Sequence, residues 1–570
     1  MAITNADIAA IFNRVADLLE IKGANPFKVR AYKNAARTVE NIGKSMADLV
    51  NEGYDLTKLP GIGHDLSEYI KEIVTTGKFS KLQELEEEIP TTLVDMLAIE
   101  GLGPKRIKTL YEKLHIKSLD DLKEAAQSGK LEELEGFGPK LIEKILRGVK
   151  LYKKEGKRFR IDIAETYADD LVKYLKQIKG VIKVEVAGSF RRRKETVGDL
   201  DVLVVAKDWD EVTDKFVKYD LVKEIVSKGP TRSTVILKSN LQVDLRSVPV
   251  ESYGSALHYF TGSKAHNIAI RKIAIDMGLK INEYGVFKDD KKIAGKNEEE
   301  VYKSVGLVYI EPELRENRGE IEAAKKNTLP NLIKLEDLRG DLHIHTKYSD
   351  GKNSIEEMAR AAIKKGYEYI AITDHSKRES IAHGLDEKRL LEQIEEIDRI
   401  NERLKNITIL KGIEVDILED GSLDLSNDVL KELDIVVGAI HFKFNLSKEK
   451  QTKRVLKAMD NPYFNILAHP TGRLIGEREP YEIDMEKILT HAKKRNCFLE
   501  INAQPQRLDL NDIHIKLAKE MSVKMAISTD SHNIFSLDYM KFGVYQARRG
   551  WAEKKDIINT KSLKELKELL

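Results

Sequence analysis

Two aspartates one residue apart, Asp199 and Asp201, open an apolar run and could bind metal ions together. Side chains alternate between the faces of a strand, so residues i and i+2 project to one side, roughly 6–7 Å apart. Two-metal phosphoryl transfer needs oxygen ligands that hold two hard cations roughly 3.5–4 Å apart. A third carboxylate, Asp244, lies in the alternating segment 241–246, which predicts a neighbouring strand. An isolated pair of this kind is more often a solvated strand edge, so its meaning depends on the residues around it.

The residues before this pair offer a place for a triphosphate. The apolar run 184–187 leads into Gly188 and Ser189, which indicates a strand that ends in a glycine turn with exposed backbone N–H groups. Three arginines follow at 191–193, and any of them could clamp phosphate oxygens. A pair of metal-binding carboxylates beside such a turn is typical of nucleotidyl transfer.

A second set of possible metal ligands lies in the region 338–570. Seven apolar runs alternate there with helical segments, which predicts parallel strands in a distorted (βα)7 barrel. The predicted strands are 341–344, 369–373, 409–413, 435–440, 465–468, 498–501 and 525–529. The candidate ligands in chain order are His343, His345, Asp350, His375, Glu414, His441, His469, Asp530 and His532.

These nine residues fall at the C-terminal ends of the predicted strands, where barrel enzymes carry their chemistry. Each alone is more often structural or solvated, but that explanation does not extend to nine such positions. Imidazole mixed with carboxylate suits Zn²⁺, Mn²⁺ or Fe²⁺ better than Mg²⁺, and nine ligands fit three ions best. Such ions would generate hydroxide at neutral pH for the hydrolysis of phosphodiesters or phosphomonoesters. Arg473 and Lys443 could neutralise the substrate phosphate, or could simply be solvated.

The first 150 residues are predicted to be helical, and they contain one short unit three times, at 59–63, 99–103 and 134–138. The paired glycines of the three units are Gly61 and Gly63, Gly101 and Gly103, and Gly136 and Gly138. The unit resembles the helix-hairpin-helix motif. Two glycines permit a tight turn, after which the free N–H groups of the next helix can face a DNA phosphate without reading sequence. One copy could be a plain helical turn, whereas three copies predict DNA binding.

Composition limits the class of protein. A chain of 570 residues is too long for one core, and roughly three or four domains are expected. The one cysteine, Cys497, excludes a disulfide framework and fits a reducing compartment, so the expected location is the cytoplasm. Neither a membrane span nor a secretory signal is expected. The net charge of +2 argues against a uniformly basic DNA binder, so contacts must come from patches. The basic segment 150–160 is one such patch, or a solvated linker.

Residues 59–316 resemble the family X DNA polymerases, the group that contains eukaryotic DNA polymerase beta. The resemblance rests on Gly188-Ser189, Gly198-Asp199-Leu200-Asp201, Tyr259-Phe260-Thr261-Gly262-Ser263, Asn267, Arg271 and the segment 278–284. It implies that Asp199, Asp201 and Asp244 hold two Mg²⁺ or Mn²⁺ ions. It further implies nucleotide contacts by Ser189, Arg192, Gly198, Tyr259, Phe260, Gly262 and Asn267, and a template-side contact by Arg271. Arg160 could also approach the triphosphate, as a palm-entry arginine of the family does.

The first hairpin of this family belongs to a small domain that grips the 5′ phosphate of a gap. In some members a lysine of this domain removes a 5′ deoxyribose phosphate through a Schiff base. The position of that lysine is Tyr69 in this sequence. Lys71 or Lys33 could substitute, but nothing in the sequence selects one. The prediction is therefore limited to phosphate binding.

The region 338–570 resembles the polymerase-and-histidinol-phosphatase (PHP) domain that bacterial family X polymerases carry after the polymerase core. The matching segments are His343-Ile344-His345-Thr346, Thr373-Asp374-His375-Ser376, Gly412-Ile413-Glu414, His469-Pro470 and Asp530-Ser531-His532. The resemblance implies one ion on His343, His345, Glu414 and Asp530. A second ion shares Glu414 with His441 and His469, and a third is held by Asp350, His375 and His532. All nine ligand positions are filled, which predicts an active site.

Six segments are predicted. They are a helical gap-binding domain at 1–85, a helix-hairpin-helix duplex-binding domain at 86–150, a nucleotidyltransferase palm at 151–255, a thumb at 256–315, a linker at 316–337 and the PHP domain at 338–570. The predicted function is gap filling in DNA repair, including base excision repair, with a separate Mn²⁺-dependent 3′–5′ exonuclease or 3′-end phosphoesterase. AP endonuclease action stays open. The expected partners are gapped or primer–template DNA and dNTPs, with no membrane, and the expected state is a monomer.

Two other functions compete with this prediction. The first is a PHP metallo-phosphoesterase whose N-terminal half serves only as a DNA-binding platform. The complete aspartate triad argues against it. The second is a gap-binding scaffold without enzymatic activity, which leaves the full ligand sets of both halves unexplained.

Overall fold

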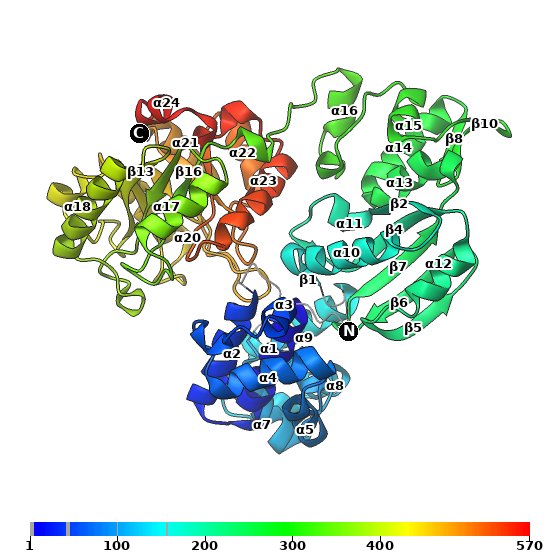
Figure 1. The fold of residues 1–570 in the computed structure, drawn as a ribbon, viewed down its shortest axis with the longest axis horizontal. Helices are drawn as coiled ribbons and strands as arrows, with labels where there is room; N and C mark the ends of the chain where they lie inside the picture. Colours follow the sequence, from blue (N-terminus) through cyan, green and yellow to red (C-terminus); the bar gives the residue numbers. More distant parts are fainter. Residues whose placement is uncertain (1–4, 41–45, 100, 156–157) are drawn as a thin grey trace. The chain divides into compact units, whose positions relative to one another are not determined.

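The computed structural model describes residues 5–40, 46–99, 101–155 and 158–570. It forms two compact units, whose helices and strands are labelled in Figure 1. The first unit comprises Met1–Phe159, Ile163–Val186 and Val197–Ser247. The second comprises Arg160–Asp162, Ala187–Thr196 and Val248–Leu570. Within the described ranges no helix is both long and apolar enough to cross a bilayer.

The N-terminal part of the first unit is helical, as predicted. Its elements are α1 (Asn5–Lys22), α2 (Pro26–Glu40), α3 (Met46–Asn51), η1 (Leu56–Lys58), α4 (His64–Thr76), α5 (Ser80–Glu88), α6 (Thr92–Asp95), η2 (Met96–Ala98), α7 (Pro104–Leu114), α8 (Leu119–Gln127), η3 (Lys130–Glu133) and α9 (Pro139–Glu155). Buried apolar side chains from Ile8 to Val149 form one continuous core. The predicted division at residue 85 therefore crosses a shared core, in which Leu85 and Ile89 both take part.

The three glycine units have the same backbone hydrogen bonds, which confirms the predicted repeat. The amide between the two glycines donates to a carbonyl three residues earlier: Ile62 to Leu59 at 3.1 Å, Leu102 to Ile99 at 2.9 Å and Phe137 to Leu134 at 3.1 Å. The first glycine of each unit has a positive φ: 74° at Gly61, 88° at Gly101 and 84° at Gly136. The carbonyl of the second glycine accepts the first bond of the following helix, from Ser67, Ile107 and Ile142. Each turn therefore leads directly into a helix N-terminus, with free amides there.

We expect alanine at the first glycine of a unit to destabilise the fold, because a positive φ costs an L-residue about 1–2 kcal/mol. Gly136→Ala carries this cost alone, since a Cβ there meets nothing within 4 Å. Gly101→Ala must in addition displace Leu141, whose Cδ1 would lie 2.4 Å from the new Cβ. The melting temperature of Gly101→Ala should be lower than that of Gly136→Ala. Both should be lower than that of the control Gly103→Ala, at a position with open space and an ordinary φ of −88°. Equal melting temperatures for all three would contradict the turn geometry.

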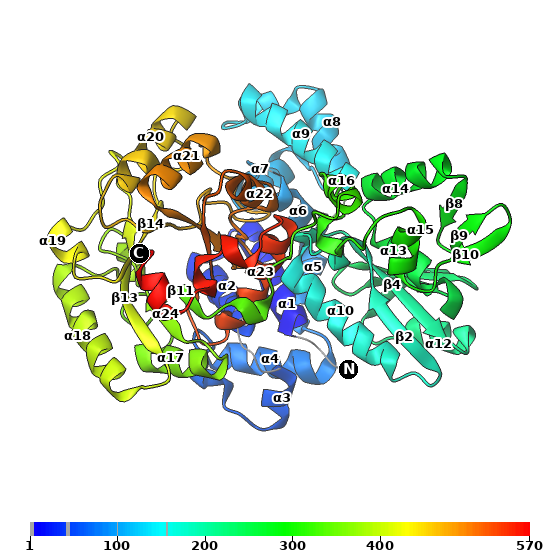
Figure 2. The same cartoon turned by 90° about the horizontal axis from the view of Figure 1, so that it is seen from above.

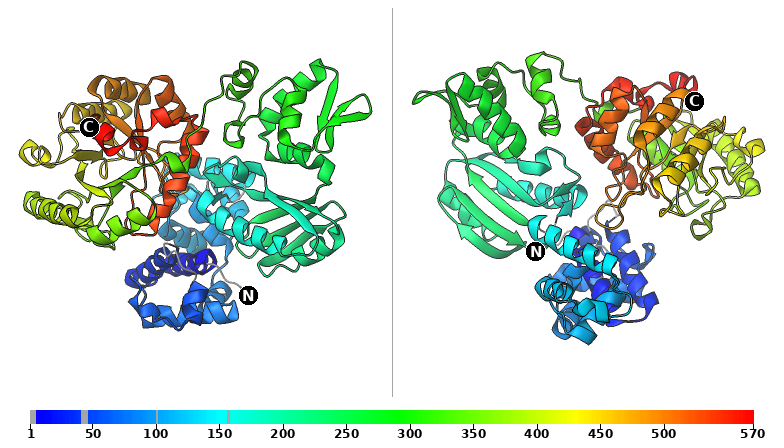
Figure 3. Two further views of the ribbon diagram at one scale, coloured as in Figure 1. Left: turned by 45° about the horizontal axis from the view of Figure 1, so that its top comes forward. Right: turned by 180° about the vertical axis from the view of Figure 1, so that it is seen from behind.

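A five-stranded mixed sheet carries the predicted catalytic aspartates. Its spatial order is β2 (Val181–Val186), β4 (Asp199–Ala206), β7 (Gln242–Ser247), β6 (Arg232–Leu237) and β5 (Val222–Lys228). β4 and β7 run parallel, and the other neighbours are antiparallel. Both views of Figure 3 show these strands. The other elements of this region are β1 (Phe159–Arg160), α10 (Ile161–Lys176), α11 (Gly188–Arg191), β3 (Thr196–Val197) and α12 (Trp209–Phe216).

The second unit continues with the predicted thumb. Its elements are η4 (Val250–Ser252), α13 (Tyr253–Thr261), α14 (Lys264–Asp276), an antiparallel sheet of β8 (Leu279–Asn282), β9 (Gly285–Lys288) and β10 (Lys291–Ala294), α15 (Glu298–Ser304) and η5 (Pro312–Leu314). The predicted linker 316–337 contains α16 (Glu320–Lys325) and η6 (Leu335–Asp337). Two contacts anchor it at the start of α16: Glu320 is buried against His266, and Arg318 forms an ion pair of 2.9 Å with Asp512 of the C-terminal region. This segment is therefore folded against its neighbours.

The C-terminal region forms the predicted barrel of seven parallel strands. They are β11 (Gly340–Ile344), β12 (Tyr369–Ile372), β13 (Thr408–Asp416), β14 (Ile435–Ala439), β15 (Ile466–Leu467), β16 (Phe498–Asn502) and β17 (Met525–Ser528), paired in this order. The first and last strands approach where the amide of His345 donates to the carbonyl of Ser531 at 2.8 Å. The barrel is thus nearly closed, and every predicted strand is present.

Helices surround these strands. They are α17 (Ile355–Lys364), α18 (Glu387–Arg403), α19 (Asn427–Leu430), α20 (Lys448–Met459), α21 (Met485–Arg495), α22 (Asp512–Glu520), α23 (Met540–Arg549) and α24 (Leu563–Lys567), with the short turns η7 (Ser380–Ala382), η8 (Ser536–Tyr539), η9 (Lys554–Asp556) and η10 (Ile558–Thr560). Figure 2 shows α17 to α21 on the outside. Alternate residues of β12 enter two separate apolar clusters, Ala371 one and Ile370 the other, as expected for a strand between a barrel interior and a helical layer.

Candidate functional site

The register of β4 and β7 brings two of the three predicted catalytic aspartates opposite each other. Asp201 and Asp244 are direct partners in the parallel ladder, and Asp199 precedes Asp201 on the same face of β4. Burial raises the pKa of Asp199, and the charge of Asp244 raises it further. Burial also raises the pKa of Asp201 to about 6, with a second contribution from Asp199. The carboxylates therefore repel one another, a cost that bound cations would relieve.

The carboxylate of Asp244 is held by protein donors. It accepts from Arg232 Nη2 at 2.9 Å, from Thr234 Oγ1 at 2.5 Å and from Gln242 Nε2 at 3.3 Å. Within the described residues, the clusters whose ligand atoms lie within 4.8 Å of one another all belong to the C-terminal barrel, so the oxygens of this triad do not converge in the same way. An ion at Asp244 would have to compete with the guanidinium of Arg232.

The arginines predicted to clamp a triphosphate have protein partners in the second unit. Arg191 donates to both oxygens of Glu298, at 3.0 and 2.7 Å. Arg192 donates to Glu316 at 3.1 Å and to the carbonyl of Thr261 at 2.5 Å. The guanidinium carbon of Arg193 lies 4.3 Å from the centre of the Tyr545 ring. Ser189, in the first turn of α11, is half-buried.

The sequence reasoning did not single out Arg158, a basic residue whose charge affects the pKa of Asp199. The sequence favoured Arg160, which pairs with Asp162 at 3.0 Å. Arg158 instead is the group whose positive charge lowers the pKa of Asp199 against the larger effect of burial. A Cβ built on Gly198 would lie 3.2 Å from Arg158 Nη1. The signal for Arg158 was the basic segment 150–160, of which residues 156–157 lie outside the described residues.

The predicted nucleotide and template residues of the thumb form one group. Tyr259 and Phe260 at the end of α13 meet edge to face, with ring centres 5.1 Å apart. Asn267 of α14 donates to the carbonyl of Tyr259 at 2.7 Å. Arg271 lies above the Tyr259 ring, 6.0 Å from its centre. Gly262 has a φ of 67° and ends α13, so the chain can turn sharply between the two helices.

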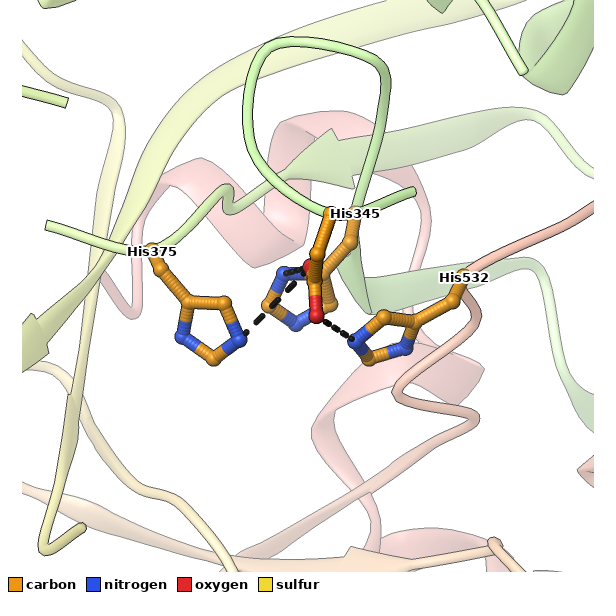
Figure 4. A group of neighbouring side chains, drawn as sticks. His345, His375 and His532 are labelled. Atoms are coloured by element: carbon orange, nitrogen blue, oxygen red, sulfur yellow. Dashed lines mark ion pairs between the residues drawn. The ribbon is translucent and has the colours of Figure 1, made fainter. Parts of the chain in front are cut away.

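The nine predicted ligands of the barrel converge at the C-terminal ends of its strands. Figure 4 shows His345, His375 and His532, which arise from different segments, turned toward one another. Glu414 lies among five imidazoles: His375 Nδ1 at 2.7 Å, His469 Nε2 at 2.9 Å, His441 Nε2 at 3.4 Å, His343 Nε2 at 3.5 Å and His345 Nε2 at 3.6 Å. These distances place all nine residues in one connected site.

Four groups of atoms in this site are close enough to hold an ion each. They are His345 with Asp350, His375 and His532; His343 with His345 and Asp530; His375 with Glu414 and His441; and Glu379 with Asp416 and His441. The resemblance assigned His345 to one ion and His375 to another, whereas the geometry brings both into the first group. Glu379 and Asp416 were not predicted.

The electrostatics of the barrel site fit divalent cations. Burial opposes the charge of Glu414, but the imidazoles of His375, His441 and His343 outweigh it and hold the pKa of Glu414 well below its usual value. Burial lowers the pKa of His441, yet Glu414 outweighs it and raises that pKa to about 10. Buried ligand atoms also lack a hydrogen bond: Nδ1 of His345, His375, His441 and His469, and Oε2 of Glu414. His375 Nδ1 and Glu414 Oε2 are 2.7 Å apart without hydrogen-bond geometry, as expected of atoms directed at a common ion.

Comparisons with known proteins agree with both halves of the molecule. Residues 3–79 match a helix-hairpin-helix domain, 93–151 a SAM-like helix-hairpin-helix tandem, 160–271 the DNA polymerase beta palm, 256–316 the DNA polymerase beta thumb and 341–504 the PHP domain. DNA polymerase/3′-5′ exonuclease PolX of Bacillus subtilis (strain 168) is 43% identical over 568 residues, 99% of each chain. The chain belongs to the family X DNA polymerases with a C-terminal PHP domain.

Two further relatives each match part of the chain. A probable phosphatase of Thermoanaerobacter sp. (strain X514) is 34% identical over 242 residues, 40% of this chain and 93% of that protein. DNA polymerase lambda of Arabidopsis thaliana is 25% identical over 347 residues, 55% of this chain and 62% of that protein. Enzymes of this polymerase and PHP type depend on metal ions, and the site in the barrel offers candidate ligands for them.

Carboxylates behind the imidazoles complete the PHP site, and the sequence reasoning missed them. His343 Nδ1 lies 2.7 Å from Glu500 Oε1, while Glu500 Oε2 accepts from the backbone amide of His469 at 2.7 Å. Asp416 Oδ1 lies 3.4 Å from His441 Nδ1, but the two atoms lack hydrogen-bond geometry. An acceptor at Nδ1 fixes the tautomer that leaves Nε2 free to bind an ion. The available signal was a carboxylate inside an apolar strand, as at Glu500 in β16.

We expect Glu500→Gln to weaken metal binding to the PHP site about 10–100-fold, because losing such an acceptor frees the ring orientation. Titration of metal-free protein with Mn²⁺ or Zn²⁺ measures this. Glu402→Gln, on the exposed face of α18, is the matched control and should bind as the wild type does. An unchanged affinity in Glu500→Gln would show that His343 is oriented by other contacts.

Proposed function

We propose that the two activities of this family X polymerase reside in two separate metal centres. The chain is a DNA polymerase and a 3′–5′ exonuclease. The observation that carries the assignment is the match to PolX over 99% of both chains, together with full ligand sets in both halves. The alternative of a phosphoesterase on a DNA-binding platform is set aside, since the palm and thumb families both match.

The polymerase centre is assigned to the palm sheet. Asp199, Asp201 and Asp244 would hold two Mg²⁺ or Mn²⁺ ions, which when bound neutralise the attacking and leaving oxygens of an in-line displacement. The raised pKa of Asp201, due to burial and to Asp199, supports a role in holding cations. Tyr259 and Phe260 would form a wall against the sugar, and Asn267 would reach the base. The remaining proposed contacts are Ser189, Arg192, Gly198 and Gly262 to the nucleotide and Arg271 to the template.

The exonuclease centre is assigned to the barrel. The nine converging residues would hold up to three ions, with Mn²⁺, Zn²⁺ or Fe²⁺ favoured by the mixture of imidazole and carboxylate. Ions of this kind lower the pKa of water for attack on a phosphodiester at neutral pH. Glu500 would orient His343 through the contact at its Nδ1. Action on 3′-terminal phosphomonoesters is a second candidate, supported by the similarity of part of this chain to a probable phosphatase.

DNA binding is assigned to the three glycine units, through backbone amides at the starts of α4, α7 and α9. The DNA would be gapped or primer–template, and the nucleotides dNTPs. Tyr69 stacks on Tyr32, with ring planes 6° apart, and also packs on Phe79. Because the family lysine position is Tyr69, the proposal is limited to phosphate binding, and lyase action through Lys33 or Lys71 stays open.

We also propose the predicted domain boundaries, a monomeric state and a cytoplasmic location. The family matches at 3–79, 93–151, 160–271, 256–316 and 341–504 support the predicted order of domains. The single buried Cys497 supports a reducing compartment. Light scattering of the purified protein measures the oligomeric state directly.

The double variant Asp199→Ala with Asp201→Ala tests the polymerase centre. We expect dNTP incorporation on a gapped duplex to fall about 10³-fold or more, because the charges that hold the metal ions are lost. The double variant should still remove 3′ nucleotides. Asp210→Ala, an exposed carboxylate on α12, controls for the loss of negative charge near the sheet. Primer extension by the double variant at the wild-type rate would refute the assignment.

The converse variant, His343→Ala with His345→Ala, tests the PHP centre. Both residues are buried ligands of the same strand end, so 3′ trimming and metal retention should both be lost while incorporation persists. His491→Ala, outside the site on α21, is the control. Loss of incorporation together with trimming would show that the two centres are not independent.

A further inference from the structure

The segment Ala187–Thr196 connects strands of the first unit but belongs structurally to the second. This segment contains Ser189 and Arg192, which the proposed function assigns to the incoming triphosphate. Its own backbone is tightly folded: the amide of Arg193 donates to Phe190 at 2.9 Å and that of Lys194 to Ser189 at 3.1 Å. Contacts that reach any part of this segment therefore bear on the proposed phosphate-binding residues as well.

The PHP domain supplies one set of these contacts. Arg473 forms a bidentate ion pair with Glu195, with Nη1 3.2 Å from Oε1 and Nη2 2.7 Å from Oε2. Gln546 donates to the same carboxylate at 3.1 Å. The Arg473 guanidinium is itself held by the carbonyls of Arg507 and Leu508. A bidentate arginine–carboxylate pair fixed on both sides orients its partner as well as attracting it.

A second PHP residue, Arg549, holds the backbone of the same segment. It is nearly fully buried, at 4% exposure, and donates to the carbonyl of Arg192 at 2.7 Å. The same guanidinium pairs with Asp512 at 2.6 Å and with Glu316 at 3.1 Å. Glu316 also accepts from the side chain of Arg192. Both the backbone and the side chain of Arg192 are thus positioned by this one cluster.

The contacts lead back to the proposed exonuclease centre. Arg473 follows the ligand His469 by four residues, and its Nε donates to the carbonyl of Arg507 at 2.8 Å. The side chain of Arg507 lies 3.6 Å from the ligand Asp530. An unbroken series of contacts therefore joins the PHP site to the proposed triphosphate-binding segment.

We propose that the PHP domain positions the triphosphate-binding segment of the polymerase through the Arg473–Glu195 ion pair. Arg473 is a positioning residue for nucleotide addition, although it stands in the hydrolase domain. This inference rests on the proposed role of Ser189 and Arg192 at the triphosphate. It adds to the PHP domain a function in nucleotide binding that is separate from hydrolysis.

Steady-state incorporation by the full-length protein on a gapped duplex tests the inference. Arg473→Ala and Glu195→Ala should each raise the KM for dNTP about tenfold, the effect of losing one charge-assisted contact, with a smaller change in kcat. The double variant should be no worse than either single variant, because both remove the same interaction. Arg403→Ala, which removes a 3.1 Å ion pair with Glu356 elsewhere in the PHP domain, is the matched control and should leave KM unchanged.

A KM within twofold of wild type in both single variants, or additive losses in the double variant, would overturn the inference. If Arg473→Ala does not fold, as judged by its melting curve, Glu195→Gln replaces it, since this change keeps the shape and removes the charge. Retained 3′ trimming by Glu195→Gln, with a raised KM, supports positioning over general damage. Failure of the proposed function would give a different result. It would be refuted by a wild-type enzyme that adds no nucleotides, or by an Asp199→Ala variant that still adds them, whatever the ion-pair variants do.

Discussion

One buried charge, that of Glu414, organises the barrel site. A carboxylate removed from water costs several kcal/mol unless cations or strong donors surround it. Here the compensation comes from imidazoles within or directly after four different strands, β11, β12, β14 and β15. Side chains so distant in sequence meet only because parallel strands end at one rim of the barrel. The pairing of His345 with Ser531, which brings the first strand to the last, is therefore a condition for the site and not only for the fold.

The palm depends on a different constraint, the register of two strands. Asp201 faces Asp244 because β4 and β7 pair in parallel, and a shift of one residue would turn either side chain to the opposite face. Register alone does not assemble the centre, since Arg232 neutralises Asp244 from the neighbouring β6. The two sites therefore differ in how far their candidate metal ligands are already arranged. In the barrel the candidate ligand atoms already converge, while in the palm Asp244 is paired with an arginine.

Much of this arrangement could be predicted from the sequence. Strands of a parallel barrel are buried on both sides, so they are continuous apolar runs, and polar residues directly after them mark the rim. The glycine units were equally visible, because a positive φ at Gly61, Gly101 and Gly136 leaves few alternatives to glycine. What the sequence could not supply were partners chosen by tertiary packing. Glu298 and Glu316 engage Arg191 and Arg192 from more than a hundred residues away, with no local pattern to indicate the pairing. Glu500 and Asp416 lie inside strands, where a single carboxylate signals a special environment but does not name its partner.

The same missed partners explain why the segment Ala187–Thr196 is not a simple loop of the palm. It is joined covalently to β2 and β4 at its ends, but its charged side chains are matched by groups of the thumb and the PHP domain. Arg191 pairs with Glu298, which the buried Arg315 also contacts, so this ion pair is part of a network shielded from solvent. Shielded pairs are costly to break, because separation leaves an uncompensated charge. The ion pairs that hold this segment are therefore supplied by the second unit, to which the segment itself belongs.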